Sequence, residues 1–330
     1  MTGTFGYDLG DGDLELSLSQ SLGAVETRLQ AAVKSDDSFV SAASRHLVDA
    51  GGKRFRPMLT LLAAQLGDPG APGVLEAAVV VELTHLATLY HDDVMDEAAR
   101  RRGTSSANAR WDNTIAILTG DFLFARASDI LADLGPEAVR IQARTFERLV
   151  TGQIRETVGP VDGQDPVAHH LQVLADKTGS LIATSGQFGA MFSGCDDHTI
   201  DVLTRYGERI GVAFQLADDL VDVASNATLS GKTPGTDLRE GVATLPALLV
   251  LQSEDPADAR LQQLLAGPLP DDLEHAEALA LLRGHSALAQ ARSEALRWAD
   301  DARSAVSALP DGSVRSALEG LCDYVVTRTS

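Results

Sequence analysis

The sequence is poor in cysteine and in positive charge, and each shortage excludes a class of protein. Its 330 residues include two cysteines, Cys195 and Cys322, too few and too far apart for a disulfide framework or a zinc site, so we expect reduced thiols. There are 27 Lys and Arg against 47 Asp and Glu, which gives a net charge of −20. Nucleic acids and anionic membranes are bound through basic surfaces. We therefore expect no nucleic-acid partner.

Long apolar runs and targeting signals are also missing. The apolar tract at residues 74–90 is interrupted by Glu76, Glu82 and His85, and it is too short to span a membrane. The N-terminus lacks the basic start and apolar core of a secretory signal, which favours a cytoplasmic location. With 44% hydrophobic residues, the chain can still bury a sizeable core. We expect a globular protein without a transmembrane segment.

Strand signals are absent, and helical signals take their place. Apolar residues recur at intervals of three and four, as at Leu59, Leu62 and Ala63, whereas alternating runs beside hairpin dipeptides do not occur. Breaks rich in Gly and Pro divide the chain into roughly ten helices, and none is long enough to be a linker. We predict one all-α domain over residues 14–330, after a mobile lead-in at residues 1–13.

Two clusters of aspartates stand inside apolar helices. The segment HDDVMD contains Asp92, Asp93 and Asp96, and the segment ADDLVD contains Asp218, Asp219 and Asp222. Residues four apart share one face of a helix, so the carboxylates repel each other unless a cation lies near them. Oxygen ligands on a firm scaffold suit Mg²⁺. Two such clusters could face each other and hold several Mg²⁺ ions around a polyphosphate; surface acids without a function are the alternative.

The other four Asp-Asp pairs have a structural explanation. The pairs that begin at Asp36, Asp196 and Asp271 stand just before apolar periodicity resumes, where aspartate caps a helix or favours its first turn. The pair at Asp300 lies in the middle of a helix without a third acid, which is typical of a solvated face. We predict no chemistry for these four pairs.

Positive charge is concentrated in two short segments. GGKRFRP ends in Pro57, the expected first residue of a helix whose free N–H groups attract anions. Its basic residues are Lys53, Arg54 and Arg56, and the second segment is the run of Arg100, Arg101 and Arg102 after Asp96. Arginine can bind phosphate oxygens in pairs. We predict two phosphate sites, one bridged to carboxylates through Mg²⁺ and one purely basic. A basic loop that only reduces the net charge is the alternative.

In this order, the motifs resemble those of the trans-isoprenyl diphosphate synthases, or polyprenyl synthetases. The matching segments are GGKRFRP, HDDVMDEAARRRG, GDFLFARA, KTGSL, FQLADDLVD and GKTPGTDLREGVATLP. The resemblance covers about residues 45–250 and, more loosely, extends to the C-terminal end. It implies a single-domain, all-α isoprenoid synthase fold with about ten core helices around a deep central cavity. It also implies a homodimeric prenyltransferase that joins an allylic diphosphate to isopentenyl diphosphate with roughly three Mg²⁺ ions per active site.

Carried over position by position, the resemblance implies a role for each matching residue. The main Mg²⁺ ligands would be Asp92, Asp96 and Asp218, supported by Asp93, Asp219 and Asp222. The allylic diphosphate would meet Arg101, Lys177, Thr178, Gln215 and Lys232. Isopentenyl diphosphate would lie on Lys53, Arg56, His85 and Arg102. The groups expected to act in catalysis are Asp92, Asp96, Arg101, Lys177, Gln215, Asp218 and Lys232. Without the resemblance, a lone His85 on an apolar helix would be a core residue.

Residues upstream of Asp92 bear on the length of the product. They are Val81, Thr84, Ala87 and Thr88, roughly one to three helical turns below the expected metals. Ala87 and Thr88 are small, which is similar to family members that make products longer than farnesyl diphosphate. Farther down, Ile117, Phe122 and Phe124 could close the channel. We predict an all-trans product of about C30 to C45, with C20 geranylgeranyl diphosphate as the alternative.

Other functions explain less of the sequence. A terpene cyclase could ionise the same substrates, but it has no second diphosphate for the GGKRFRP segment to bind. A non-catalytic partner subunit usually loses motif acids, and both clusters are intact here. A structural scaffold explains neither cluster. His169 and His170 show no converging partners in the sequence, and we expect them to pack or to lie on the surface.

Overall fold

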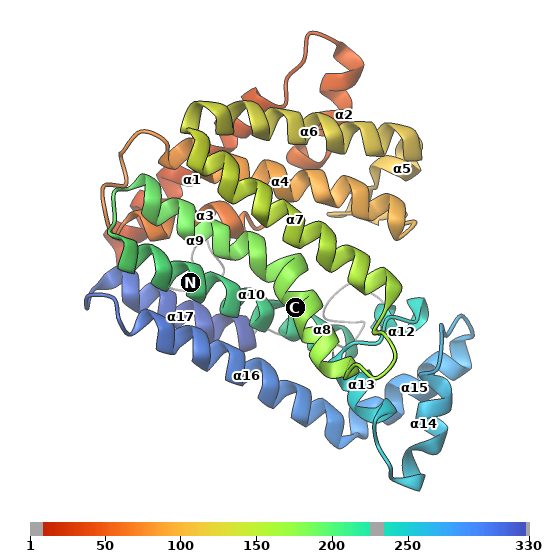
Figure 1. The fold of residues 1–330 in the computed structure, drawn as a ribbon. Coiled ribbons are helices and arrows are strands. Elements are labelled where there is room, and N and C mark those ends of the chain that lie inside the picture. The colour runs from red at the N-terminus through yellow and green to blue at the C-terminus, as the bar shows by residue number, and fades with distance from the viewer. Residues whose placement is uncertain (1–8, 225–233, 328–330) are drawn as a thin grey trace. The chain divides into compact units, whose positions relative to one another are not determined.

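The computed structural model of the chain describes residues 9–224 and 234–327, which form helices joined by short loops (Figure 1). The first helices are α1 (Gly12–Ala32), α2 (Ser38–Asp49), α3 (Phe55–Ala64), α4 (Val74–Met95), α5 (Ala107–Arg110), α6 (Asn113–Leu134) and α7 (Pro136–Val158). Next come α8 (Pro166–Leu174), the π-helical segment η1 (Ala175–Gly179), α9 (Ser180–Phe192), α10 (Asp197–Ala224), α12 (Thr236–Glu240) and α13 (Leu245–Leu251). The last are the 3₁₀ turn η2 (Pro256–Asp258), α14 (Ala259–Leu264), α15 (Asp272–Gly284), α16 (Ser286–Val306) and α17 (Ser313–Thr327). The predicted all-α fold class is confirmed. Among the described residues, no helix is both long and apolar enough to cross a membrane.

One very short strand pair interrupts this pattern. Strand β1 (Arg100–Arg101) pairs antiparallel with β2 (Thr104–Ser105), and Arg101 stands opposite Thr104. The turn between them has positive φ at Arg102 (+50°) and at Gly103 (+78°). Strands of two residues are too short for an alternating pattern, which is why the sequence gives no sign of them.

Aspartate caps begin several helices, as predicted. Side chains that accept backbone N–H groups of the first turn are those of Asp37, Asp196 and Asp271, from the predicted pairs, and that of Asp11, which was not predicted. Two predicted starts need correction. The Asp11 cap begins α1 at Gly12, within the lead-in predicted for residues 1–13, and α3 begins at Phe55 rather than Pro57. Pro57 still lies in the first turn, where its missing N–H leaves no intrahelical bond unmade.

The helices group into two compact units, which we describe separately. The first unit comprises Met1–Glu147, Leu181–Gly207 and Ala308–Ala317. The second comprises Arg148–Ser180, Glu208–Ser307 and Leu318–Ser330. The single domain over residues 14–330, with its central cavity, stays a prediction, and residues 1–8 of the lead-in lie outside the described residues.

Helix α4 is the core helix of the first unit. It is apolar and buried almost all round, as expected of a helix in the interior, and it packs against α1, α3 and α6. Gly120 of α6 approaches it closely, since a Cβ there would lie 2.3 Å from His91 Nε2 and 3.1 Å from Ala87 O. A larger residue would push α6 away from the end of α4 that carries Asp92.

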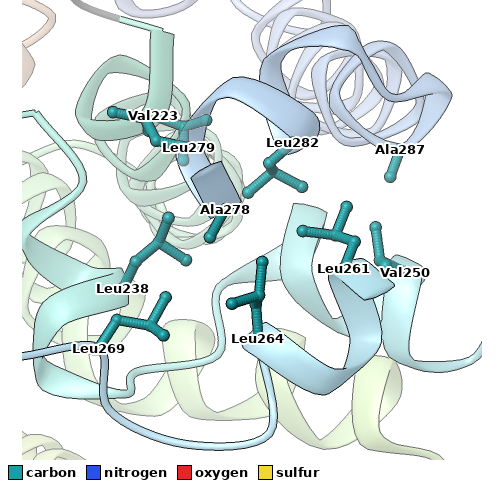
Figure 2. Close-up of a cluster of buried hydrophobic side chains, with 10 residues drawn as sticks. All are labelled: Val223, Leu238, Val250, Leu261, Leu264, Leu269, Ala278, Leu279, Leu282 and Ala287. Atoms are coloured by element: carbon teal, nitrogen blue, oxygen red, sulfur yellow. The ribbon is translucent and has the colours of Figure 1, made fainter. Parts of the chain in front are cut away.

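Two apolar clusters hold the second unit together. Figure 2 shows the larger cluster, in which side chains from α10 and from the segments between α12 and α16 point toward one another. Leu238 of α12 is one of them, so this cluster fixes α12 relative to Val223 of α10. The other cluster joins Leu174 and Ala175 to Val212 of α10. The unit therefore positions α12 and η1 beside the helix that carries Asp218.

Candidate active site

The first aspartate cluster lies at the C-terminal end of α4, in the first unit. Asp92 is half-buried, Asp93 is fully buried and Asp96, the C-cap, is exposed. Arg101 Nε donates to Asp93 Oδ1 at 2.6 Å, and Arg101 Nη2 lies 3.9 Å from Asp96 Oδ2. Burial raises the pKa of Asp93, and the Arg101 guanidinium opposes that rise. A basic side chain of the same unit thus offsets part of the cluster's charge.

The turn between β1 and β2 directs Arg102 toward the GGKRFRP loop. Arg102 Nη1 donates to the carbonyl oxygen of Leu47 at 3.1 Å and to that of Gly51. Its guanidinium lies against Gly52, where an added Cβ would be 2.8 Å from Arg102 Cζ. The structure therefore brings the two basic segments together, 51 positions apart in sequence at the Arg102–Gly51 contact.

A buried glutamate of α4 holds this basic cluster in place. Glu82 is 1% exposed and accepts from Arg54 Nη1 at 2.8 Å and from Arg102 Nη2 at 3.4 Å. Arg54 Nε also donates to Glu26 of α1 at 2.9 Å, so we interpret Arg54 as a structural residue. Sequence reasoning noted Glu82 only as a break in an apolar tract. The sequence feature that could have identified Glu82 is a lone acidic residue on an otherwise apolar helix.

Burial shifts the pKa values of two predicted substrate-binding residues. Burial lowers the pKa of Arg56 to about 10, and Glu82 opposes the shift, so the side chain stays cationic at pH 7. Burial, followed by the charges of Arg56 and Arg102, lowers the pKa of His85 well below its usual value, so its imidazole is neutral. Lys53 is exposed on the adjoining loop. All four residues predicted to bind isopentenyl diphosphate lie in the first unit.

The second aspartate cluster lies near the C-terminal end of α10, in the second unit. Asp219 is 7% exposed and accepts from Gln215 Nε2 at 3.0 Å. The backbone N–H groups of Thr236 and Asp237 donate to the two carboxylate oxygens of Asp222, each at 3.2 Å. These bonds tie the start of α12 to the cluster.

Several acidic side chains lie close to this second cluster. Burial raises the pKa of Asp219 to about 8, and repulsion from Asp237 and Asp218 adds to the shift. Burial also raises the pKa of Asp237 to about 7, with repulsion from Asp222. Sequence reasoning missed Asp237, although it stands within the quoted segment GKTPGTDLREG. Carboxylate oxygens are the donor type that suits a hard divalent cation.

The π-helical segment η1 presents Lys177 and Thr178. Single π turns within helices often occur at functional sites. Asp176, which is 5% exposed, anchors the segment by accepting from Arg148 Nε at 3.0 Å and from Arg155 Nη1 at 2.6 Å. Two ion pairs with arginines of α7 therefore hold the π turn that carries the predicted binding residues Lys177 and Thr178.

Two residues that were not predicted lie against predicted ones. Glu156 Oε2 is 2.5 Å from Lys177 Nζ. His170 Nε2 is 3.7 Å from Asp219 Oδ2, too far for a hydrogen bond, and burial lowers the pKa of His170 to about 4. His170 Nε2 finds no hydrogen-bond partner among the described residues, which agrees with the packing role expected for it. Predicted Lys232 lies outside the described residues.

The predicted chain-length residues lie inside the first unit. Val81, Thr84 and Ala87 are fully buried, and Thr88 is 8% exposed. Thr84 Oγ1 donates to Val80 O at 2.9 Å and accepts from Gln142 Nε2 of α7 at 2.8 Å. A hydroxyl in this apolar helix is thus bound to a neighbouring helix.

The three candidates for a channel floor, Ile117, Phe122 and Phe124, do not line one common cavity. Ile117 is 43% exposed, and Phe122 lines a cavity of about 290 Å³ next to Phe39 of α2. Phe124 lines a different cavity, of about 460 Å³, where its ring centroid is 4.3 Å from that of Phe146. The expectation that these three residues close one channel therefore needs correction, and Phe124 remains the candidate.

Each unit carries one aspartate cluster, and their convergence on one ligand stays a prediction. Within residues 9–224 and 234–327, no three His, Cys, Asp or Glu side chains converge closely enough to hold a metal ion. Mg²⁺ commonly takes one or two carboxylates and completes its shell with waters and substrate phosphates. The arrangement in each unit is compatible with ions that bind together with a diphosphate.

Comparison with known proteins gives the family. Residues 37–282 match the family model described as polyprenyl synthetase. The chain belongs to the polyprenyl synthetase family, which confirms the predicted family and the predicted class of enzyme, a prenyltransferase. It is 49% identical over 324 residues to the nonaprenyl diphosphate synthase of Mycobacterium tuberculosis, covering 98% of this chain and 97% of that protein.

Solved structures agree with this assignment. A geranylgeranyl pyrophosphate synthase from Corynebacterium glutamicum, in complex with calcium and isoprenyl diphosphate, is 46% identical with a TM-score of 0.88, covering 98% of this chain and 99% of that one. A decaprenyl diphosphate synthase from Rhodobacter capsulatus is 34% identical with a TM-score of 0.87, covering 96% and 99%. The fold is shared along nearly the whole length.

Proposed function

We propose that the chain is an all-trans polyprenyl diphosphate synthase with a product of about C30 to C45, judged from the small residues along α4. The observation that carries the proposal is a second, predominantly basic site in the first unit. Arg54 and Arg102 donate to the buried Glu82, whose charge also acts on Arg56, and this site is distinct from the Asp93–Arg101 contact. An enzyme that joins two diphosphates needs such a second anion site, whereas a terpene cyclase does not.

Mg²⁺ suits the donor groups of both clusters. Asp93 Oδ2 is buried and has no hydrogen-bond partner in the described part of the chain, and Asp219 is a buried acid beside other acids. We propose as main ligands Asp92, Asp96 and Asp218, and as supporting ligands Asp93, Asp219 and Asp222, for roughly three ions. When bound, Mg²⁺ would neutralise charge that develops on the departing pyrophosphate.

The side chains of the two units would divide the work of binding. We propose that Arg101, Lys177, Thr178, Gln215 and Lys232 bind the allylic diphosphate. We propose that Lys53, Arg56, His85 and Arg102 bind isopentenyl diphosphate. Because His85 is neutral, it can donate one hydrogen bond to a phosphate oxygen without adding charge. Lys177 and Gln215 would also stabilise the allylic cation.

The reaction would proceed by ionisation, condensation and elimination. The allylic C–O bond breaks, and its electron pair leaves with pyrophosphate. The double bond of isopentenyl diphosphate then forms a new C–C bond to the cation, which moves the positive charge to C3 of the former isopentenyl unit. The released pyrophosphate takes up a proton from C2, and the electron pair of that C–H bond becomes the new double bond. The product is an allylic diphosphate longer by one C5 unit. Apolar walls exclude water, which would otherwise quench the cation.

One incubation tests this function. Purified protein receives farnesyl diphosphate, an excess of labelled isopentenyl diphosphate and Mg²⁺, and the dephosphorylated products are separated by chain length. We expect products of about C30 to C45. The absence of label in any lipid product would refute the synthase, and a sharp stop at C20 would replace the long-chain product with the alternative below.

Geranylgeranyl diphosphate, C20, is the second candidate product. A 46% identical solved structure is named a geranylgeranyl pyrophosphate synthase, which favours it, whereas the 49% identical relative is named a nonaprenyl diphosphate synthase. We further propose that the enzyme acts as a homodimer, as the resemblance implies, and that it is located in the cytoplasm. Size-exclusion chromatography with light scattering would give its mass in solution.

A further inference from the structure

The β1–β2 turn, which carries Arg101 and Arg102, needs support from outside itself. Its strands have two residues each, and a hairpin this short is at best marginally stable in water. Arg102 has φ +50°, a left-handed conformation that is costly for a residue other than glycine. Burial, with repulsion from Arg54 and Arg101, lowers the pKa of Arg102, and Glu82 opposes the shift. The turn is therefore both strained and repelled by its neighbours, and other contacts must hold it.

Helix α2 supplies such a contact through His46. This residue is 8% exposed, and its Nε2 lies 2.7 Å from the carbonyl oxygen of Ser105, the last residue of β2. The other ring nitrogen, Nδ1, lies 3.0 Å from Arg110 Nη1. A guanidinium can only donate, so Nδ1 accepts, and the ring carries its hydrogen on Nε2. His46 therefore donates to Ser105, which is 59 positions away in the sequence.

Packing keeps the His46 ring in this orientation. The ring meets Trp111 edge-on, with 5.2 Å between the two ring centroids. The guanidinium of Arg110 lies over the same tryptophan, 4.6 Å from the centroid of its ring. Trp111 thus contacts both partners of the Nδ1 hydrogen bond, and the ring of His46 has little freedom to turn away from Ser105.

Helix α2 is in turn attached to α4. Tyr90 of α4 donates from its hydroxyl to the carbonyl oxygen of Ala43 at 2.6 Å and accepts from the backbone N–H of Leu47 at 3.2 Å. The carbonyl oxygen of Leu47 also accepts from Arg102 Nη1. Helix α2 therefore holds the turn at two points, Ser105 and Arg102, and is itself bound to the helix that carries the first aspartate cluster.

We propose that His46 is a positioning residue for both diphosphate sites. This proposal deepens the proposed function and rests on it. By holding Ser105, His46 keeps β2 paired with β1. Arg101 then lies at the first aspartate cluster, and Arg102 lies at the GGKRFRP loop, before either substrate binds. Without this bond, each diphosphate would have to order the turn as it binds, and that cost would weaken its binding.

Two substitutions separate the two hydrogen bonds of the ring. Glutamine places an amide nitrogen near the position of Nε2, so His46→Gln keeps the donation to Ser105. His46→Asn is too short for that contact and keeps only an acceptor for Arg110. We expect His46→Asn to raise the KM for both diphosphates roughly 3- to 12-fold, which corresponds to one lost hydrogen bond. His46→Gln should keep both KM values within about twofold of the wild type. Initial rates with farnesyl diphosphate and isopentenyl diphosphate at varied concentrations measure them.

A binding measurement gives a second readout that needs no turnover. The site proposed for isopentenyl diphosphate contains no metal, so isothermal titration calorimetry in EDTA gives the Kd of this substrate directly. His46→Asn should raise the Kd by the same factor as the KM, and His46→Gln should restore it. An unchanged Kd in His46→Asn would overturn the proposal. Equal losses in the two variants would also overturn it, because the ring would then act through packing alone.

A second buried contact of α2 provides the matched control. Ser44 is fully buried, and its hydroxyl lies 2.6 Å from the carbonyl oxygen of Val33 at the end of α1. Ser44→Ala should lower the urea concentration at the midpoint of unfolding but leave both KM values unchanged. A smaller folded fraction lowers the apparent kcat and not the KM. If Ser44→Ala raises both KM values as much as His46→Asn does, any loosening of α2 is sufficient and the proposal is wrong.

Circular dichroism shows which variants fold. If His46→Asn does not fold, His46→Leu decides the matter, because it keeps an apolar contact with Trp111 and removes both ring nitrogens. It should raise both KM values by the same factor, and wild-type KM values in it would refute the role of His46. If the wild-type protein incorporates no isopentenyl diphosphate, the proposed function fails. If the wild type elongates normally and the variants match it, the role of His46 alone is refuted.

Discussion

The two aspartate clusters share one sequence pattern, yet the structure balances their charge differently. In the first unit, Arg101 lies 2.6 Å from Asp93 and 3.9 Å from Asp96. In the second unit, Asp219 is bound by the neutral Gln215, and its pKa rises to about 8 through burial and repulsion by Asp237. The spacing of the aspartates along a helix therefore does not determine the local electrostatic field. The charged and polar groups that the fold places beside them determine it. We expect the second cluster to depend more strongly on bound cations.

The largest expected effect tests whether both clusters act in catalysis at all. Asp92→Asn and Asp218→Asn should each lower kcat/KM by about a thousandfold, because each removes negative charge that would hold a metal ion at the departing pyrophosphate. Steady-state incorporation of labelled isopentenyl diphosphate measures this loss. If either substitution lowers kcat/KM by less than tenfold, the cluster that contains it does not help to stabilise the leaving group.

A third Asp-Asp pair supplies the matched control. Asp37 belongs to such a pair but caps α2, where its carboxylate accepts from the backbone N–H of Phe39 at 2.8 Å. Asparagine caps a helix about as well as aspartate does. Asp37→Asn should therefore leave both activity and the free energy of unfolding unchanged.

A second prediction concerns the internal ion pairs of the first unit. Glu82→Gln removes the buried charge that Arg54 and Arg102 share, which leaves buried guanidinium groups close together. We expect the free energy of unfolding to fall by about 3 kcal/mol and the KM for isopentenyl diphosphate to rise. Urea unfolding and initial rates measure the two effects. Glu76→Gln, nearer the start of α4, should change stability by less than about 0.5 kcal/mol. Equal losses in the two variants would refute a special role for Glu82.

The sequence predicts what depends on local pattern and misses what depends on distant contacts. Caps such as Asp37 and Asp271 follow from their position before an apolar run, and so does the helical class. Gln142 could not be predicted, because its partner Thr84 is 58 positions away on another helix. Glu82 and His170 acquire their neighbours in the same way, across helices that the sequence does not place side by side.

A third, smaller effect separates the two clusters by their response to Mg²⁺ alone. Asp219→Asn should raise Tm in EDTA by about 2 °C, because it removes a buried carboxylate that its neighbours repel. It should also lose most of the rise in Tm that Mg²⁺ produces in the wild type. Asp93→Asn, in the cluster whose charge Arg101 partly offsets, should lose a smaller part of that rise. Thermal unfolding with EDTA and with Mg²⁺ checks both variants, and equal behaviour would contradict the difference in cation dependence.

The smallest expected effect concerns Glu156, an acid of the second unit that lies 2.5 Å from Lys177. If Lys177 binds the allylic diphosphate, Glu156 competes with the substrate for it, and its charge also adds to the repulsion that raises the pKa of Asp237. Removing the charge of Glu156 would end its competition with the substrate for Lys177 and would reduce the repulsion at Asp237. Glu156→Gln should therefore lower the KM for the allylic substrate. Partly exposed ion pairs are weak, so we expect about a two- to fivefold change in KM. Glu137→Gln, which breaks an exposed pair with Arg140 on the same helix, is the control. A higher KM would instead mean that Glu156 orients Lys177 for binding.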